Sequence, residues 1–94
     1  MKRRYYVYIL SNQRRTVYYV GVTNSIERRY FEHLWKKNPK SFCVRYNINE
    51  LLYFEDYTDV DQAIAREKQL KRWGRDKKVL LVKRVNPEMR NYLC

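Results

Sequence analysis

The stretch YYVGVTNSIERRYFEH, residues 18–33, changes its pattern from strand to helix around a single glycine. Tyr18 to Val22 is aromatic and β-branched, a composition that favours strands. Asn24 then offers a helix N-cap, with Glu27 three positions later as in a capping box. The expected helix has an apolar residue at every fourth position, at Ile26, Tyr30 and Leu34. The stretch therefore predicts a strand–glycine–helix junction.

Two further strands are predicted around this junction. YYVYIL, residues 5–10, has the same aromatic and β-branched character as TVYYVGV, residues 16–22, and the polar SNQRR lies between them. This arrangement favours an antiparallel hairpin. LLYFEDY, residues 51–57, is expected to form the third strand. Residues 36–49 contain a proline and lack a sustained period, so we expect a loop there.

Two helices are predicted after the third strand. TDVDQAIAREKQLKRWG, residues 58–74, offers Asp59 as N-cap and Gly74 as a C-terminal glycine. DKKVLLVKRV, residues 76–85, suits a strand or a short helix, and we favour a helix that is capped by Asp76 and ends before Pro87. The order β-β-α-β-α-α predicts a small α/β (α+β) fold with a three-stranded, largely antiparallel sheet flanked by helices. Residues 1–94 are expected to form one domain.

The composition indicates a basic protein that binds a polyanion. The chain has 94 residues, with 21 Lys and Arg against 10 Asp and Glu, which gives a formal net charge of +11. No apolar run approaches the roughly 20 residues that a bilayer span needs, and the N-terminal residues do not have the pattern of an export signal, so we expect a protein that is not exported. Cys43 and Cys94 form neither a CxxC pair nor a disulfide framework, so we expect a cytoplasmic protein that does not bind a membrane.

Glu67 is an anomaly in the helix expected over residues 58–74. At 100° per residue it projects into the apolar face formed by Val60, Ala63, Ile64 and Leu70. An uncompensated carboxylate in such a place costs several kcal/mol, so it is expected to meet a cation, a metal ion or strong donors. A structural salt bridge to one of the arginines is the alternative to a functional role.

Arg29 and His33 lie four positions apart and therefore on one side of the first helix. Taken singly, each is explained as a boundary or solvated residue. The pair gains weight from Gly21 just upstream, because glycine lets a ligand approach the backbone closely. Tyr8 and Tyr19 lie on the two strands of the hairpin and could stand side by side, although most of the ten tyrosines must be core or rim residues.

Charged residues gather in two parts of the second half of the chain. A basic run from Arg66 to Arg84 includes Trp73 and is either a solvated face or a phosphate-binding surface; with a net charge of +11, the second interpretation is favoured. Its candidate nucleic-acid-binding residues are Lys71, Arg72, Arg75, Lys77 and Lys78. The acidic residues Glu50, Glu55, Asp56, Asp59 and Asp61 are interpreted as surface charges and helix caps.

Taken in order, these residues resemble the GIY-YIG nuclease domain, and in particular its small stand-alone bacterial branch. The two signature triplets fall on Tyr6-Val7-Tyr8 and Tyr19-Val20-Gly21, with Tyr6 in place of the first glycine. The helix arginine falls on Arg29, and His33 follows one turn later. The metal-binding glutamate matches Glu67 within AREKQLKRW, and a late asparagine matches Asn86. The resemblance spans residues 5–87.

The resemblance implies hydrolysis of nucleic-acid phosphodiester bonds, DNA more than RNA, with one divalent ion. Glu67 would hold Mg²⁺ or Mn²⁺, hard cations that take oxygen ligands. Arg29 would stabilise charge on the phosphate. Tyr19 would accept the proton of the attacking water, with Tyr8 as a neighbour and His33 as the competing base. Asn86 would orient the phosphate or another site residue.

Two alternatives to a catalytic domain stay open at this stage. A nucleic-acid-binding protein could keep the fold and the basic face without turnover, and charge alone supports it equally well. An accessory module could dock on a larger repair, recombination or translation assembly through Trp73 and exposed tyrosines. A protein partner would then supply substrate specificity.

Overall fold

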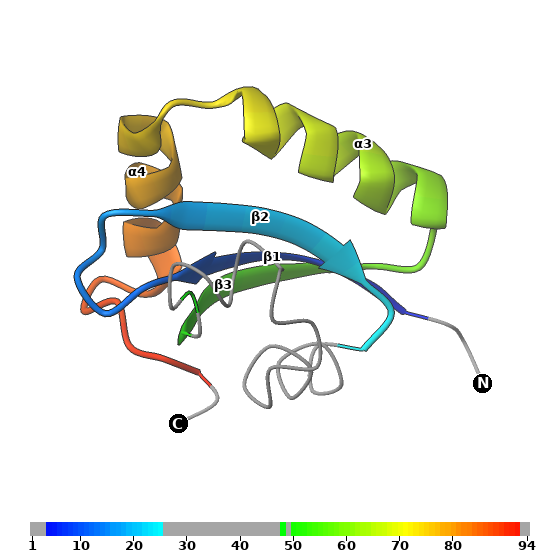
Figure 1. The fold of residues 1–94 in the computed structure, drawn as a ribbon. Coiled ribbons are helices and arrows are strands. Elements are labelled where there is room, and N and C mark those ends of the chain that lie inside the picture. Colours follow the sequence, from blue (N-terminus) through cyan, green and yellow to red (C-terminus); the bar gives the residue numbers. More distant parts are fainter. Residues whose placement is uncertain (1–3, 26–47, 49, 93–94) are drawn as a thin grey trace.

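The computed structural model describes residues 4–25, 48 and 50–92. Its sheet has three antiparallel strands in the order β2-β1-β3, formed by β1 (Tyr5–Ser11), β2 (Tyr18–Thr23) and β3 (Glu50–Tyr57). Two helices follow, α3 (Val60–Arg72) and α4 (Arg75–Val85). Figure 1 shows α3 above the sheet and α4 at the end of the sheet where β2 begins. The predicted fold class is confirmed, while the helix expected after Asn24 lies outside the described residues.

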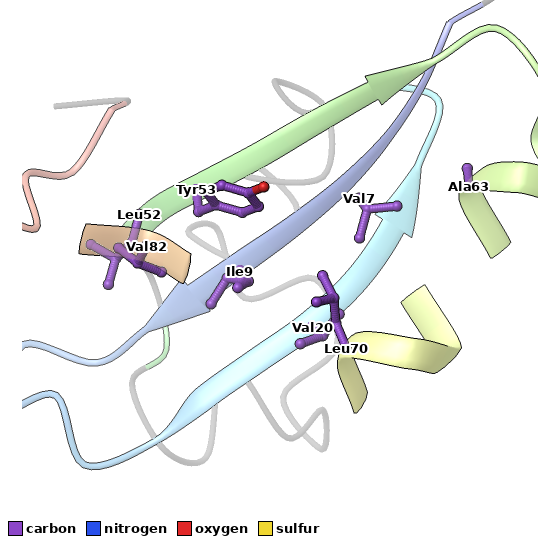
Figure 2. Packing of buried hydrophobic residues seen from close by; sticks show 8 residues of the cluster. All are labelled: Val7, Ile9, Val20, Leu52, Tyr53, Ala63, Leu70 and Val82. Atoms are coloured by element: carbon purple, nitrogen blue, oxygen red, sulfur yellow. The ribbon is translucent and has the colours of Figure 1, made fainter. Parts of the chain in front are cut away.

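The core lies between the sheet and the two helices. Successive residues of a strand point to opposite faces, so Val7 and Ile9 of β1, two positions apart, point to the same side. They pack with Val20, Leu52, Tyr53, Ala63, Leu70 and Val82 (Figure 2). Ala63 and Leu70 are seven residues apart, two turns of α3, and both are fully buried. This pairing fixes which side of α3 faces the sheet.

The opposite face of the sheet carries a second buried cluster. It consists of Tyr8, Leu10, Ile48 and Leu51, with Val17 and Tyr19 packed against it. Leu52 and Tyr53 are consecutive on β3 and yet both belong to the cluster that faces the helices, because the β1–β3 register shifts between Ile9 and Leu10. Such a bulge places one extra residue on one strand. Tyr8 lies between Val7 and Ile9 on β1, so its side chain points to the other side of the sheet.

The hairpin between β1 and β2 is closed by a side chain. Oδ1 of Asn12 accepts hydrogen bonds from the backbone N–H groups of Thr16 and Val17 at 2.9 and 3.3 Å. These two residues are therefore part of the turn, and β2 begins two residues later than the sequence pattern predicts. Arg15 adopts a positive φ of 58° in this turn.

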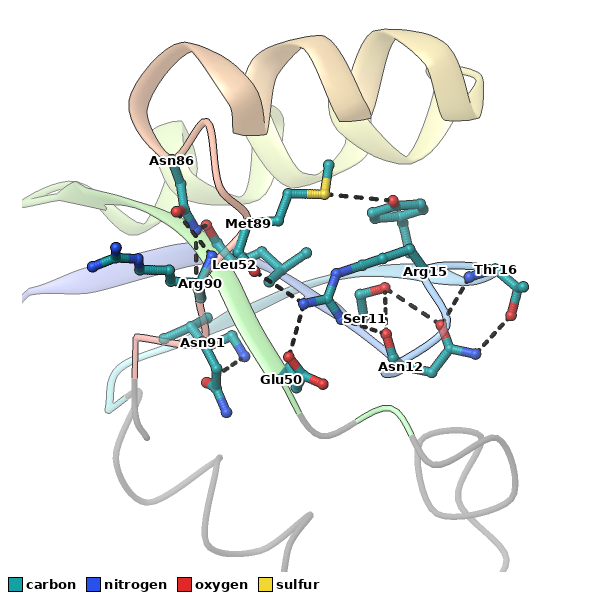
Figure 3. A network of polar contacts seen from close by, with 12 residues as sticks. Ser11, Asn12, Arg15, Thr16, Glu50, Leu52, Asn86, Met89, Arg90 and Asn91 are labelled. Atoms are coloured by element: carbon teal, nitrogen blue, oxygen red, sulfur yellow. Dashed lines mark hydrogen bonds and ion pairs between the residues drawn. The ribbon is translucent and has the colours of Figure 1, made fainter.

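Arg15 also joins the hairpin to the far end of the chain, as Figure 3 shows. Its guanidinium donates to Oε1 of Glu50 at 2.8 Å and to the carbonyl oxygen of Met89 at 2.9 Å. The C-terminal segment then lies along β3, because the N–H of Tyr92 donates to the carbonyl of Leu51 at 2.9 Å. Glu50 is therefore a structural partner of Arg15, and its interpretation as a surface charge was wrong.

Of the three helix caps predicted from the sequence, the structure confirms one and corrects two. Asp59 is the N-cap of α3, as predicted, and accepts a hydrogen bond from the N–H of Asp61 at 2.8 Å. Gly74 is not a left-handed C-terminal glycine, because its φ is −70° and it serves as the N-cap of α4. Asp76 lies in the first turn of α4 instead of capping it. The helix ends at Val85, before Pro87, as expected.

Within the part of the chain that the structure describes, neither helix is long and apolar enough to cross a membrane.

Candidate nucleic-acid and metal site

The tyrosines of the two signature triplets lie together on one face of the sheet. Tyr8 of β1 and Tyr19 of β2 have ring centroids 6.4 Å apart, with an angle of 38° between the ring planes. Tyr8 is buried to 3% exposure, whereas Tyr19 is half-buried. The β1–β2 register pairs Tyr8 with Gly21 and Leu10 with Tyr19, so the two rings meet on a diagonal. The side-by-side arrangement expected of these tyrosines is present.

Gly21 makes this arrangement possible. A Cβ atom on Gly21 would lie 2.5 Å from Cζ of Tyr8, well inside van der Waals contact. The ring of Tyr8 therefore occupies the space that any other residue at position 21 would need. The glycine of the second triplet is required by this close approach, since its φ is not positive.

Glu67 lies on the sheet-facing side of α3, as its position in the sequence predicts. It is four residues from Ala63 and three from Leu70, both fully buried, and its own side chain is 14% exposed. Its neighbour is a lysine one turn further along α3: Nζ of Lys71 lies 3.2 Å from Oε2 of Glu67. The cation that the sequence analysis expects near this carboxylate is thus present in the same helix.

The sheet separates Glu67 from the tyrosine pair. Ala63 and Leu70 attach α3 to the face that carries Val7 and Val20. Tyr8 and Tyr19 belong to the other face. α3 contacts both β1 and β2, the strands that carry Tyr8 and Tyr19, but it does so from the face opposite the two tyrosine rings.

Glu67 alone is a sufficient protein ligand only for a metal that keeps most of its water. Among the described residues, no group of three or more His, Cys, Asp or Glu side chains could hold a metal ion. Mg²⁺ is commonly bound through one or two carboxylates and retains several waters, so a single, mostly buried carboxylate suits Mg²⁺ or Mn²⁺ but not zinc. The donor set therefore fits the expected ion, provided that it displaces Lys71.

Asn86 is buried at the C-terminal end of α4, and its side chain makes hydrogen bonds with backbone groups. Its Nδ2 donates to the carbonyls of Leu52 and Arg90 at 2.9 and 2.8 Å, and its Oδ1 accepts from the N–H of Arg90 at 3.0 Å. Figure 3 shows this side chain between β3 and the C-terminal segment. Both amide protons are used, so the geometry does not support direct contact between the amide and a substrate phosphate.

Arg29 and His33, the remaining candidate catalytic residues, lie outside the described residues.

The candidate nucleic-acid-binding residues occupy the junction of α3 and α4. Arg72 is exposed, and Arg75 reaches back to the hairpin, where it donates to the carbonyl of Thr16 at 2.8 Å. Nζ of Lys77 lies 5.6 Å from the centre of the Trp73 ring, close enough for a cation–π contact. Burial lowers the pKa of Lys78, which is the least exposed of the five lysine and arginine candidates.

Glu55 is the site feature that sequence reasoning missed, because it was interpreted as surface charge. Its carboxylate accepts hydrogen bonds from the hydroxyls of Tyr53 and Tyr57 and from Nε of Arg66, the last at 3.0 Å. Burial opposes ionisation of Glu55, but the hydrogen bond from Arg66 and those from the tyrosines lower its pKa overall. The signal was available: Tyr53, Glu55 and Tyr57 alternate along β3 and share one face.

Arg66 links this carboxylate to α3 next to Glu67. Its guanidinium is 22% exposed and lies 5.2 Å from the centre of the Trp73 ring. The Arg66–Glu55 ion pair therefore connects the middle of α3 to β3, one residue before Glu67. Its position indicates that it fixes the rotation of α3 over the sheet.

The fold and the two triplets place the chain in a known class of catalytic domain. The sequence model of the GIY-YIG catalytic domain matches residues 4–79. The chain belongs to this family, whose members are nuclease-type domains.

A solved structure is similar over most of its length. This is the solution NMR structure of the UPF0213 protein BH0048 from Bacillus halodurans, with 28% identity and a TM-score of 0.55. The alignment covers 88% of the present chain and 86% of that protein. The comparison with curated proteins gave no match.

Proposed function

We propose that this protein is a metal-dependent endonuclease-like enzyme that hydrolyses phosphodiester bonds of nucleic acid, DNA rather than RNA, in repair or recombination. The observation that carries the proposal is the Tyr8–Tyr19 pair, with ring centroids 6.4 Å apart, in a chain that belongs to the GIY-YIG family. The net charge of +11 supports a polyanionic substrate.

The residues of this chain would divide the work in a simple way. Arg29 would bind the scissile phosphate, because the guanidinium fork matches phosphate oxygens and stabilises charge that develops on them. The attacking water must lose a proton, and Tyr19 and His33 are the two candidates to accept it. A phenol of pKa near 10 is a weak base at neutral pH, which is the reason to keep His33 as a competitor.

Glu67 would hold one Mg²⁺ or Mn²⁺ ion. A bound divalent ion supplies positive charge to a phosphate oxygen and to the departing oxygen. A phosphodiester that reaches both Glu67 and the tyrosine pair has to pass around an edge of the sheet, since the two lie on opposite faces. The exposed cations at the α3–α4 junction would hold the neighbouring phosphates.

The test is a cleavage assay on supercoiled plasmid and branched DNA with a magnesium titration. Glu67→Gln should abolish cleavage and also the magnesium-induced NMR shifts along α3. Glu88→Gln is the matched control, because it removes an exposed carboxylate that pairs with Arg90 away from α3. If Glu67→Gln cuts as fast as the parent, the assignment of the metal ligand is wrong.

Arg29→Ala separates chemistry from binding. If Arg29 stabilises charge at the reacting phosphate, the variant should slow cleavage by about a hundredfold and weaken DNA binding much less. A loss confined to affinity would make Arg29 a phosphate anchor.

The separation of Glu67 from the tyrosines favours a second candidate, a nucleic-acid-binding protein without turnover. Its affinity should fall by about 0.9 log unit per log unit of salt for each duplex phosphate contact, with or without magnesium. Nicking of plasmid that depends on magnesium and on Glu67 would exclude this candidate.

A further inference from the structure

Three aromatic side chains form a row on the face of the sheet that carries Tyr8. Tyr6 and Phe54 have ring centroids 6.1 Å apart at 73°, and Phe54 and Tyr92 have centroids 5.8 Å apart at 80°. Both pairs are edge-to-face contacts, the arrangement that aromatic rings prefer. The row runs from β1 over β3 to the C-terminal segment.

The row is continuous with the tyrosine pair. The β1–β3 register places Phe54 directly opposite Tyr8, and Tyr6 is two residues from Tyr8 on the same strand face. Tyr19, Tyr8 and Phe54 thus come from three neighbouring strands, in the order of the sheet. A substrate held at Tyr8 and Tyr19 would have Phe54 beside it.

Phe54 and Tyr92 are exposed although they are large and aromatic. Phe54 is 45% and Tyr92 is 44% exposed, and both line an open hollow of about 560 Å³ at the β3 edge of the sheet. Its other lining residues are Tyr53, which belongs to the core under the helices, and Val85 of α4. Exposed aromatic rings in contact with one another provide apolar surface on which a flat ligand can stack. The volume of the hollow is in the range of small-ligand pockets.

The two rings are held in place before any ligand arrives. Phe54 lies within β3, and the backbone N–H of Tyr92 is tied to the carbonyl of Leu51. Oδ1 of Asn91 also accepts a hydrogen bond from the N–H of Leu51 at 3.0 Å. Rings that are already ordered lose little conformational freedom on binding, so stacking on them is efficient.

Exposed aromatic rings on a strongly basic protein are suited to the bases of a nucleic acid. A protein with a net charge of +11 concentrates nucleic acid, and bases are the flat apolar parts of that polyanion. Sheets that bind single strands present exposed aromatic side chains on which unpaired bases stack. A fully paired duplex has its bases stacked inside and offers nothing to such rings.

We propose that Phe54 and Tyr92 form a stacking surface for an unpaired base of the nucleic acid whose phosphodiester lies at Tyr8 and Tyr19. This rests on the proposed function in taking nucleic acid as the substrate. It adds that the substrate is single-stranded next to the site, as in a flap, a gap or a branched junction.

The test compares two labelled oligonucleotides of equal length by fluorescence anisotropy in EDTA, so that cleavage and metal play no part. One is single-stranded oligodeoxythymidine, and the other has the same phosphates but abasic sugars. The parent protein should bind the strand with bases roughly tenfold more tightly. Equal affinity of the parent for the two strands overturns the proposal without any variant having to fold.

Variants locate the preference. The double variant Phe54→Leu with Tyr92→Leu keeps apolar bulk but removes both rings, so its affinity for the two strands should be equal. Tyr92→Phe keeps the ring and should behave as the parent. Leu80→Ala, which removes another exposed apolar side chain from α4, is the control and should retain the preference. A double variant that folds and keeps the preference for bases overturns the proposal and leaves the row as a protein-docking surface.

The outcomes for this inference and for the proposed enzyme are distinct. Ring-dependent binding together with an absence of magnesium-dependent nicking would reject the hydrolase and keep the stacking surface. Nicking that depends on Glu67, with binding that does not depend on bases, would do the reverse.

Discussion

The ring of Tyr8 lies over Gly21, its partner across the β1–β2 pair, so that one residue of the first signature triplet rests on one residue of the second. Gly21→Ala should force the ring aside and cost about 1–3 kcal/mol in the free energy of unfolding, as overpacking does. Denaturant unfolding measures this. Tyr8→Ala is itself destabilising because it empties a buried site, but in that background Gly21→Ala should cost little, because the clash is gone; additive losses in the double variant would contradict the contact.

Replacing Gly74, in contrast to Gly21, should stabilise the protein. Nothing lies within 4 Å of a Cβ atom at this position, and its φ of −70° suits any residue. Gly74→Asp would give α4 the capping side chain that glycine cannot supply and place a negative charge at the helix N-terminus. We expect a gain of about 0.5–1 kcal/mol in thermal or denaturant unfolding. A loss of stability would show that the chain needs glycine here for another reason.

Asn86→Ala should reveal a structural role. The variant leaves the carbonyls of Leu52 and Arg90 and the N–H of Arg90 without their partner. Unsatisfied buried polar groups cost about 1–3 kcal/mol each, so a loss of about 2–3 kcal/mol is expected. Amide hydrogen exchange should show faster exchange at Arg90 and Tyr92. If instead stability is unchanged and only cleavage is lost, Asn86 acts on the substrate.

The Glu55 cluster predicts how stability depends on pH. The pKa of Glu55 is held below its ordinary 4.5 despite burial, so the stabilisation is present above about pH 4.5 and is lost as pH falls through the folded-state pKa. Glu55→Gln should remove this part of the acid slope. It should also cost about 2 kcal/mol at pH 7, since Arg66 and two tyrosines lose a charged partner.

At alkaline pH, the contribution of this cluster to stability falls as pH rises instead of as pH falls. Burial, together with the Glu55 carboxylate, raises the pKa of Tyr57 from its ordinary 10 to about 12. This contribution is complete below pH 10 and disappears as pH rises through 12. Burial and the Glu55 carboxylate also raise the pKa of Tyr53, so phenolate absorbance should show one fewer late-titrating tyrosine in Tyr57→Phe than in the parent. Identical titration curves for the two proteins would contradict the hydrogen bond to Glu55.

Lys71 should compete with a metal ion for Glu67. Its Nζ lies 3.2 Å from the carboxylate and is half exposed, so the pair is easily broken and contributes at most about 1 kcal/mol. Lys71→Met should therefore leave stability almost unchanged and strengthen magnesium binding several-fold, as read from NMR shifts of α3. Lys68→Met, on an exposed part of the same helix, is the matched control. Weaker magnesium binding in Lys71→Met would contradict competition.

Local patterns along the chain predicted a large part of this protein. The aromatic and β-branched composition of residues 5–10 predicted β1, and Asp59 marked the start of α3 because capping depends on neighbours in sequence. The pairing of Tyr8 with Tyr19 followed from a short hairpin. Gly74 was misread because a glycine between two helices can end the first or begin the second, and its φ decides which.

The tertiary structure decided what depends on contacts between distant segments. Glu55 is a half-buried partner of Arg66 because α3 packs across β3. The hydrogen bonds of Asn86 are taken up by Leu52 and by Arg90 of the C-terminal segment. The placement of α3 on the face opposite Tyr8 is likewise a result of packing. Periodicity within an element fixes which of its sides is apolar, but the face of the sheet that receives this side is chosen by the free energy of the whole core.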